Sequence, residues 1–280
     1  MSRRKVIKRI LFYLVLVIVC FVILFPFLLL FSYSLRTSNE IFSLKIKFIP
    51  RNPTLQAYKN ALLTYAVGGS TFRTWILNSL MVCGFATVSS VFISSLCGYG
   101  ISRFRFFGKK PLLFIIFLTQ TVPWVVVSLP FYIMISRIGM VDRLSSLAIT
   151  YLAILTPVST WLFTGFFKNI PLETEEAARI DGCSHLGVYY RIILPLSVPG
   201  ISAIALFAFV LGWSDYLLAS IILKSVENWT IPLGLTSFQG EHHILWAEIM
   251  AMSTIVTIPI VVLFLYLQRY LINLMAGGLK

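Results

Sequence analysis

The sequence predicts an all-α membrane protein with about six transmembrane helices. Of its residues 58% are hydrophobic and only 12% are charged, about half the charged fraction of a typical soluble domain. The charges also lie between long uncharged stretches, and a helix needs roughly 20 apolar residues to cross the hydrocarbon core of a bilayer. We therefore expect a single transmembrane domain over residues 1–280, with its core at 74–270.

Six uncharged stretches are long enough to span the membrane. The first is too long for a cleavable signal peptide, and no Ala-x-Ala site follows it. The predicted spans are Ile10–Leu35, Thr74–Ser102, Pro111–Ser136, Leu144–Phe167, Ile192–Ser214 with an extension past Asp215 to Leu223, and Ile249–Gln268. Prolines remove a backbone donor and favour either ordinary bending or a hinge; those in the spans are Pro26, Pro123, Pro130, Pro157, Pro199 and Pro259.

The basic residues predict which side of the membrane each loop faces. Fourteen Lys and Arg residues fall on the side of the two termini and nine on the other side, six of these in one long loop. Cytoplasmic loops are enriched in Lys and Arg, and long loops count for less. We therefore expect both termini in the cytoplasm. The same topology explains the net charge of +13, so we expect no nucleic-acid partner.

No motif predicts enzymatic chemistry or a bound cofactor. Gly108-Lys109 lacks the earlier glycine and the following Ser or Thr of a phosphate-binding loop. The sequence contains no His-Glu-x-x-His or Gly-x-Ser-x-Gly pattern, and its four cysteines form no closely spaced pair. We therefore expect no catalytic residue, no metal and no cofactor in this chain.

The loop between the fourth and fifth spans, about residues 168–195, has a pattern that an ordinary loop does not need. Pro171 suits a first helical position, and negative charge in the first turn complements the helix dipole; the acids there are Glu173, Glu175 and Glu176. Gly182 stands where a left-handed terminator belongs, and Ser184 can cap a second helix to about Ile193. The pattern predicts two short helices around a glycine hinge with positive φ at Gly182.

A short rigid helix of this kind suits a protein partner. The small side chains of Ala177 and Ala178 allow close approach, and Glu176 offers a charge for a basic residue of the partner. The alternative is an interfacial helix lying on lipid. Three acids in the first turn disfavour an anionic membrane surface for it.

The loop contains Glu176-Ala177-Ala178, then Gly182 after three residues, and Ile192-x-Leu194-Pro195 after nine more. This pattern resembles the EAA motif of ABC importer permeases. Further segments resemble the carbohydrate branch of that family, in particular the maltose-type second permease subunit. They are Asn78-Ser79-Leu80, Arg103 to Gly108, Ile180-Asp181-Gly182, Gln268-Arg269-Tyr270 and Ala276-Gly277-Gly278. Trp213-Ser214-Asp215-Tyr216 stands where the family pattern has Trp-Asn-Glu-aromatic.

The resemblance implies a permease subunit of an ATP-driven importer for a sugar or oligosaccharide, in a bacterial or archaeal cytoplasmic membrane. It implies a second homologous permease, two ATPase subunits that bind ATP and Mg²⁺, and an extracytoplasmic solute-binding protein, besides membrane lipid. It also implies which residues couple to the ATPases: Glu176, Ala177, Ala178, Asp181, Gly182, Ile192, Leu194 and Pro195.

Asp215 is the only acid predicted deep within a span. A charge at mid-membrane costs at least about 2.5–3.5 kcal/mol, so it should face the bundle interior or a wet cavity. Aromatic faces beside a carboxylate suit a sugar ring, which makes Trp213, Asp215 and Tyr216 candidates for the substrate path. The alternative is a structural residue near the external boundary.

The second span carries small residues at four-residue spacing. Such a stripe lets two helix backbones approach closely within a membrane. We expect it to pack on another helix, of this subunit or of its partner, the alternative being a stripe that faces lipid. The residues are Ala86, Ser90, Ser94 and Gly98.

Three other functions compete with this prediction. A self-sufficient secondary transporter would need its own coupling-ion site at mid-membrane, and only Asp215 is available for one. A membrane-embedded enzyme would need clustered His, Asp or Cys residues within the spans, which the sequence lacks. An importer of amino acids or peptides shares the EAA motif, and only the carbohydrate-branch matches separate it from a sugar importer.

Overall fold

The computed structural model describes residues 3–41, 48–239 and 244–277. Gly278 lies outside these ranges, as do Lys45, Lys47 and Lys280, which are among the basic residues counted in the sequence analysis. The contacts within the chain divide it into two units. The first contains residues 1–67 and 235–258, and the second contains residues 68–234 and 259–280.

The first unit contains the long helix α1 (Arg3–Ser34), α2 (Ser38–Ile41), α3 (Gln56–Lys59), the π-helical turn η1 (Asn60–Thr64), strand β1 (Ala66–Val67) and the first part of α14 (Trp246–Gly277). The apolar stretch of α1 buries none of its residues within the chain. Polar contacts gather instead at the end of the helix and beyond it. Ser34 Oγ lies 2.7 Å from Tyr58 Oη, and Asn60 donates to Glu248 Oε1 at 3.1 Å.

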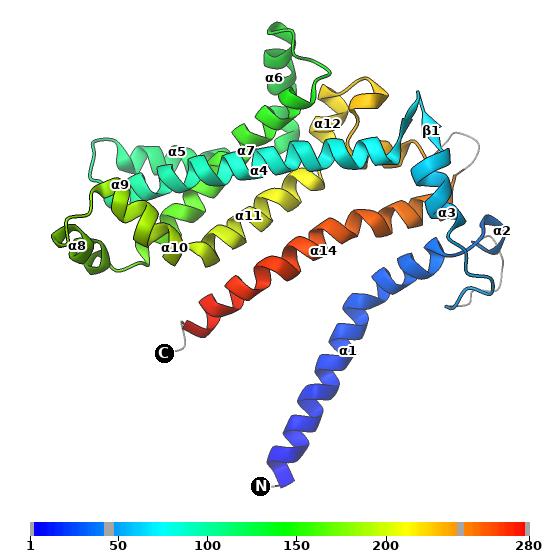
Figure 1. The fold of residues 1–280 in the computed structure, drawn as a ribbon, viewed down its shortest axis with the longest axis horizontal. Helices are drawn as coiled ribbons and strands as arrows, with labels where there is room; N and C mark the ends of the chain where they lie inside the picture. Colours follow the sequence, from blue (N-terminus) through cyan, green and yellow to red (C-terminus); the bar gives the residue numbers. More distant parts are fainter. Residues whose placement is uncertain (1–2, 42–47, 240–243, 278–280) are drawn as a thin grey trace. The chain divides into compact units, whose positions relative to one another are not determined.

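The second unit is a bundle of helices. Its elements are strand β2 (Ser70–Thr71), α4 (Phe72–Arg103), α5 (Lys109–Thr121), α6 (Trp124–Arg137), α7 (Leu144–Lys168), α8 (Leu172–Ile180), α9 (His185–Val188), η2 (Tyr189–Ile193), α10 (Leu194–Leu196), α11 (Val198–Trp213), α12 (Leu217–Ile222), η3 (Val226–Asn228) and most of α13 (Ile231–Thr236). Helices α4, α7 and α11 pack on one another and form its centre (Figure 1).

The small-residue stripe of α4 lies in the interface with α7, as predicted. Ser90 and Ser94 are fully buried, and Ser94 Oγ donates to the Thr156 carbonyl at 3.0 Å. At Gly98 a Cβ atom would lie 2.6 Å from Phe163 Cβ, closer than side chains pack. Because only small residues permit this approach, the stripe determines how closely the two central helices pack.

Among the residues that the structure describes, four helices are individually long and apolar enough to cross a membrane: α1, α4, α7 and α14. Two bent pairs bring the number to six if each pair forms one span. The α5–α6 pair bends by 101° and the pair formed by His185–Leu196 and α11 bends by 75°. The prediction of about six spans is therefore confirmed, but the third and fifth are not the continuous helices that we expected.

Proline explains the first of these breaks. Helix α5 ends at Thr121, and Pro123 precedes the first turn of α6 with an extended ψ of 135°. A proline cannot donate the backbone hydrogen bond that would continue α5, and it pushes the residue before it away from the helical region. Pro26, Pro130, Pro157 and Pro259 instead lie inside continuous helices.

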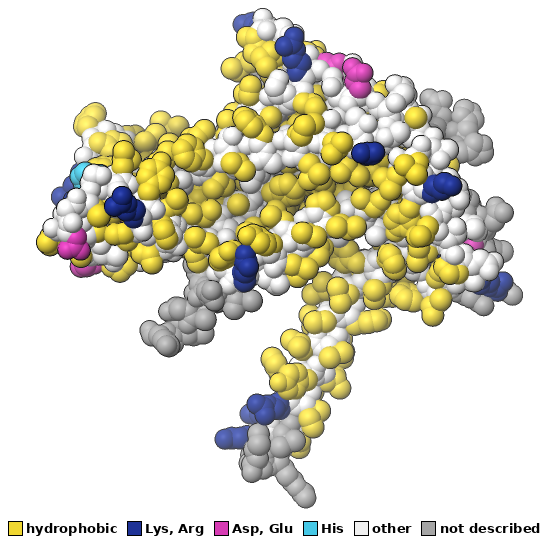
Figure 2. Space-filling model, in the orientation of Figure 1, with side chains coloured by type: hydrophobic (Ala, Val, Ile, Leu, Met, Phe, Trp, Pro, Cys, Tyr) yellow, Lys and Arg dark blue, Asp and Glu magenta, His cyan; other side chains and the backbone are white. Residues whose placement is uncertain are grey.

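Apolar side chains cover the outer faces of the helices. On α4, Phe85, Val88 and Phe92 are each more than half exposed. Figure 2 shows hydrophobic side chains over most of the visible helix surface, whereas the acidic residues near α8 lie at the end of the bundle. Such apolar surface is stable in lipid and not in water. This distribution fits a multi-pass membrane protein.

Candidate functional site

Helix α8 begins and ends as its sequence predicts. Pro171 precedes the helix with an extended ψ of 137°, and Glu173 and Glu175 lie in the first turn. Gly182 follows with a φ of 87°, and the amide of Cys183 donates to the Ala178 carbonyl at 3.0 Å. The left-handed glycine thus closes the helix with the hydrogen bonds of a glycine C-cap. The predicted positive φ at Gly182 is confirmed.

The second short helix of the loop starts at its predicted cap. Ser184 Oγ accepts from the Gly187 amide at 3.1 Å, and α9 continues into η2, which ends at Ile193. This satisfies one of the amides that a helix start leaves without an intrahelical partner. The sequence analysis did not predict the π-helical geometry of η2.

The two faces of α8 differ in exposure. Glu176 and Ala177 are exposed and Ile180 is 86% exposed, whereas Glu175 and Ala178 are 4% and 6% exposed. The prediction that Ala177 and Ala178 form one contact surface for a partner is therefore wrong. Adjacent residues on a helix lie about 100° apart, so only Ala177 belongs to the outward face.

The inward face of α8 joins a hydrophobic cluster that contains residues from α4, α7 and α11 as well as from the loop itself. Its buried members are Tyr99, Phe163, Phe167, Ala178, Val188, Tyr189, Ile193 and Ile204. Tyr189 Oη also lies 2.7 Å from Ser95 Oγ, inside the bundle. Ile192 and Leu194 of the predicted motif pack against this cluster, while Asp181 and Pro195 are exposed.

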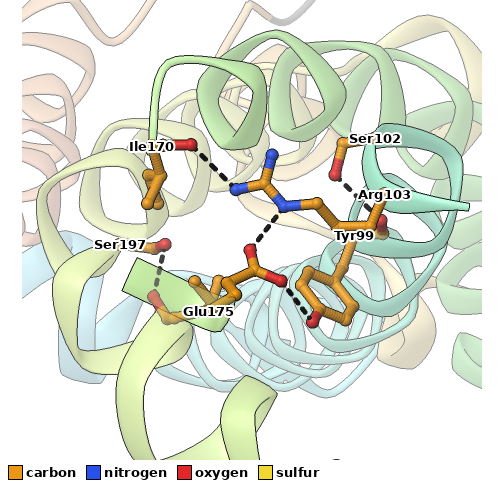
Figure 3. A network of polar contacts seen from close by, with 7 residues as sticks. Tyr99, Ser102, Arg103, Ile170, Glu175 and Ser197 are labelled. Carbon is orange, nitrogen blue, oxygen red and sulfur yellow. Dashed lines mark hydrogen bonds and ion pairs between the residues drawn. The ribbon is translucent and has the colours of Figure 1, made fainter. Parts of the chain in front are cut away.

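A buried polar network attaches α8 to the end of α4 (Figure 3). Glu175 Oε1 pairs with Arg103 Nε, and Glu175 Oε2 accepts a hydrogen bond from Tyr99 Oη at 2.9 Å. Arg103 Nη2 donates to the Ile170 carbonyl at 3.0 Å. The side chains of Arg103 and Glu175 are only 10% and 5% exposed. We call these four residues the latch.

Sequence reasoning missed the latch. It assigned Glu175 to the helix dipole and used Arg103 only for the charge count and as the start of a segment that resembles the carbohydrate branch, although Figure 3 shows the two side chains pointing toward each other. The sequence offers one partial signal, because Glu175 and Ala178 are three residues apart and therefore share a helix face. It does not show that this face is the buried one.

The second predicted site lies at the other end of α11. Asp215 Oδ2 accepts from Tyr151 Oη at 2.9 Å and from the Ala219 amide at 3.2 Å, so the carboxylate caps α12. Trp213 is 2% exposed and stacks on Phe209, with 5.2 Å between the ring centroids. Tyr216 is 47% exposed. The structure therefore does not bring this site and the latch together, and a role of the three residues in substrate transport stays a prediction.

The start of α4 holds a different polar network, made of side chains that bind backbone groups. Trp75 Nε1 donates to the Val226 carbonyl at 2.8 Å. Asn78 Nδ2 donates to the carbonyls of Glu227 and Trp229 at 2.8 and 2.9 Å, and Ser79 Oγ accepts from the Ile231 amide at 2.8 Å. We call Trp75, Asn78 and Ser79 the staple, because they fix segment 226–231.

Asp142, in the α6–α7 loop, secures residues 224–228, which overlap this segment. It has a φ of 63° and accepts from the amides of Lys224 and Ser225 at 2.8 and 2.9 Å, from the Ser225 hydroxyl and from the Asn228 amide. Partial burial by itself would raise the pKa of Asp142, but these hydrogen bonds outweigh it and lower the pKa below its ordinary value. No cluster of metal-binding side chains occurs among the residues that the structure describes.

Residues 90–276 match the model of the family described as the binding-protein-dependent transport system inner membrane component. This chain belongs to that family. The match begins inside α4 and includes α8, Gly182 and both bent helix pairs. It identifies the protein as a multi-pass inner-membrane permease component.

Comparisons with individual proteins agree with this family. The chain is 34% identical over 281 residues to the maltodextrin transport system permease protein of Bacillus subtilis, covering 100% of this chain and 99% of that protein. It is 32% identical to the diacetylchitobiose uptake system permease protein of Streptomyces coelicolor, covering 92% of each. The fold resembles a solved bacterial ABC transporter involved in the import of alginate, with a TM-score of 0.80, 21% identity and coverage of 96% and 98%.

Proposed function

We propose that this permease is a subunit of an ATP-driven ABC importer that carries a sugar or oligosaccharide. The observation that carries the proposal is α8, a helix at the end of the bundle that turns Glu176 and Ile180 outward while Glu175 anchors it. Docking of an ATPase requires an exposed helix whose inward face is fixed to the rest of the bundle. The carbohydrate class is supported by the relatives, whose names refer to maltodextrin and diacetylchitobiose.

In the proposed complex a second, homologous permease completes the translocation path. Two ATPase subunits bind the α8 end in the cytoplasm and hold ATP and Mg²⁺, so this chain performs no covalent chemistry. An extracytoplasmic solute-binding protein delivers substrate at the opposite end of α4. The distribution of Lys and Arg supports this orientation, with both termini and loop 168–195 inside.

The outward face of α8 forms the ATPase contact in this proposal. Glu176 pairs with a basic residue of the ATPase, and the attraction is stronger in a shielded groove than in bulk water. Ala177 keeps the surface flat, and Ile180 adds apolar area that binding removes from water. Closure of the ATPases displaces α8, and the bundle responds by opening toward the opposite side of the membrane.

For the substrate path we propose distinct roles for the three residues around Asp215. Tyr216, which is 47% exposed, offers an aromatic face to a sugar ring. Asp215 is a positioning residue, because Tyr151 and the α12 amides already occupy its carboxylate. Trp213 supports this turn from inside the bundle, stacked on Phe209.

The test uses the assembled transporter in lipid nanodiscs with its solute-binding protein. Oligosaccharides, amino acids and peptides are compared for stimulation of ATP hydrolysis and for uptake into proteoliposomes. We expect one carbohydrate class to stimulate both. Stimulation by amino acids or peptides alone would show that the substrate class is wrong.

Glu176→Lys should release the ATPases, while Glu173→Lys, a matched change at an exposed acid of the same helix, should retain them.

A further inference from the structure

We infer that Glu175 and Arg103 are positioning residues that transmit displacement of α8 to α4. The inference rests on the proposed function, since it concerns how movement at the ATPase-facing helix reaches the bundle. It goes beyond the predicted coupling residues, which include neither Glu175 nor Arg103. The geometry of the latch carries it.

One carboxylate connects α8 to two points of α4. Glu175 Oε1 meets Arg103 Nε, and Oε2 meets Tyr99 Oη at 2.9 Å. Arg103 and Tyr99 are four residues apart and therefore lie on one face of α4, about one turn from each other. A single hydrogen bond would leave a pivot, whereas two bonds to different turns restrict both rotation and sliding of α8 against α4.

The guanidinium of Arg103 adds a third point. Its Nη2 donates at 3.0 Å to the carbonyl of Ile170, which lies in the connection between α7 and α8. Arg103 therefore holds α8 through Glu175 and holds the segment that leads into α8 through Ile170. The end of α4, the connection between α7 and α8, and the first turn of α8 are thus tied to one side chain.

The latch is also next to the surface on which the ATPase would act. Glu176, the residue after Glu175, is exposed on the outward face. The apolar contacts of Ala178 resist separation, but hydrophobic contact is non-directional and does not by itself determine register. Charge-assisted hydrogen bonds are directional. The latch therefore supplies the register that the hydrophobic cluster does not.

Stability alone does not account for a buried ion pair at this place. Apolar residues of similar volume are often as stabilising as a buried pair, and determination of register is its best-attested use. A side chain that merely stabilised the loop would reduce the yield of intact transporter without changing the work done per ATP. A positioning role predicts a change in that ratio.

The experiment measures solute imported per ATP hydrolysed by the assembled transporter in proteoliposomes. We expect Glu175→Gln and Arg103→Gln to retain the ATPases and to hydrolyse ATP, but to import about tenfold less solute per ATP, within the usual range of coupling between sites. The double variant leaves no unpaired charge, so its loss should be smaller than the product of the two single losses. Glu173→Gln, at an exposed acid of the same helix, should couple normally.

If the Gln variants do not assemble, Arg103→Lys is tested in their place. It keeps the positive charge but lacks the planar guanidinium that binds both Glu175 and Ile170. We expect this variant to assemble with a reduced import per ATP. Unchanged import per ATP in every assembled variant would overturn the inference while leaving the proposed function in place. Absence of ATPase binding and of any solute response in the wild-type complex would instead refute the proposed function.

Discussion

The two ends of α4 are held in different ways. At its start, the staple and Asp142 make many bonds to the backbone of one loop, from Trp75, Asn78, Ser79 and the Asp142 carboxylate. At its end, the latch places one ion pair, between Glu175 and Arg103, beneath a helix whose other face is exposed. Three side chains of α4 hold the start independently, so no single contact decides its geometry, whereas every polar bond of the latch goes through Glu175 or Arg103.

This difference fits the tasks that we propose for the two ends. Bonds to backbone carbonyls hold a loop in one shape whatever its side chains, which suits a stable surface for a solute-binding protein. A few directional bonds that share two charged side chains hold a helix in register and can also follow its movement. Sensitivity to single substitutions should therefore be greatest at the latch.

Arg103→Ala should have the largest effect on stability. It leaves Glu175 buried without its charged partner, and breaking a buried pair in this way costs about 3–5 kcal/mol. The measurement is thermal unfolding of the assembled transporter in nanodiscs, with Arg105→Ala as the control at an exposed arginine two residues away. Equal unfolding temperatures for the two variants would contradict the view that the latch holds this end.

Asn78→Ala should have a smaller effect at the other end. It removes the donor to the carbonyls of Glu227 and Trp229, at a cost of about 1–3 kcal/mol. Trp75 and Ser79 still hold the same segment, so we expect transport and segment 226–231 to survive. Limited proteolysis and thermal unfolding measure this, with the exposed Asn169→Ala as the control. A loss as large as that of Arg103→Ala would remove the distinction between the two ends.

Gly182→Ala tests the loop next to the latch. The φ of 87° costs a residue with a Cβ about 1–2 kcal/mol, although a Cβ there would meet no atom within 4 Å. We expect the loop of this variant to fold, but a smaller fraction of molecules to hold it in the ATPase-binding conformation. The variant should therefore retain the ATPases less well. Gly165→Ala, also in open space but inside helix α7, should retain them fully.

The smallest effect concerns pH at Asp142. Its folded-state pKa is lowered, so its hydrogen bonds stabilise the fold above the ordinary pKa, and that contribution disappears as pH falls through the folded-state value. Wild type should therefore exceed Asp142→Asn in unfolding temperature by a constant amount near neutral pH, and the difference should shrink in acid. A difference that grows as the pH falls would show that the sign is wrong.

The sequence by itself determined the features that depend on local pattern. Long apolar stretches predicted the spanning helices, the four-residue spacing of Ser90, Ser94 and Gly98 predicted a helix contact, and Gly182 predicted the end of α8. Each of these follows from neighbouring residues, because helix periodicity and backbone preference are local properties. The structure changed them in one respect, since it bends the third and fifth predicted spans into helix pairs.

Tertiary structure alone decided which distant side chains meet. Glu175 lies 72 residues from Arg103, and Asp142 lies 83 residues from Ser225. An acid in the first turn of a helix satisfies a local rule whether it faces solvent or a buried arginine, so its pattern does not reveal its partner. The partner is chosen only when packing of α4, α7 and α11 brings the ends of the helices together, and the cost of an unpaired buried charge then selects the pair.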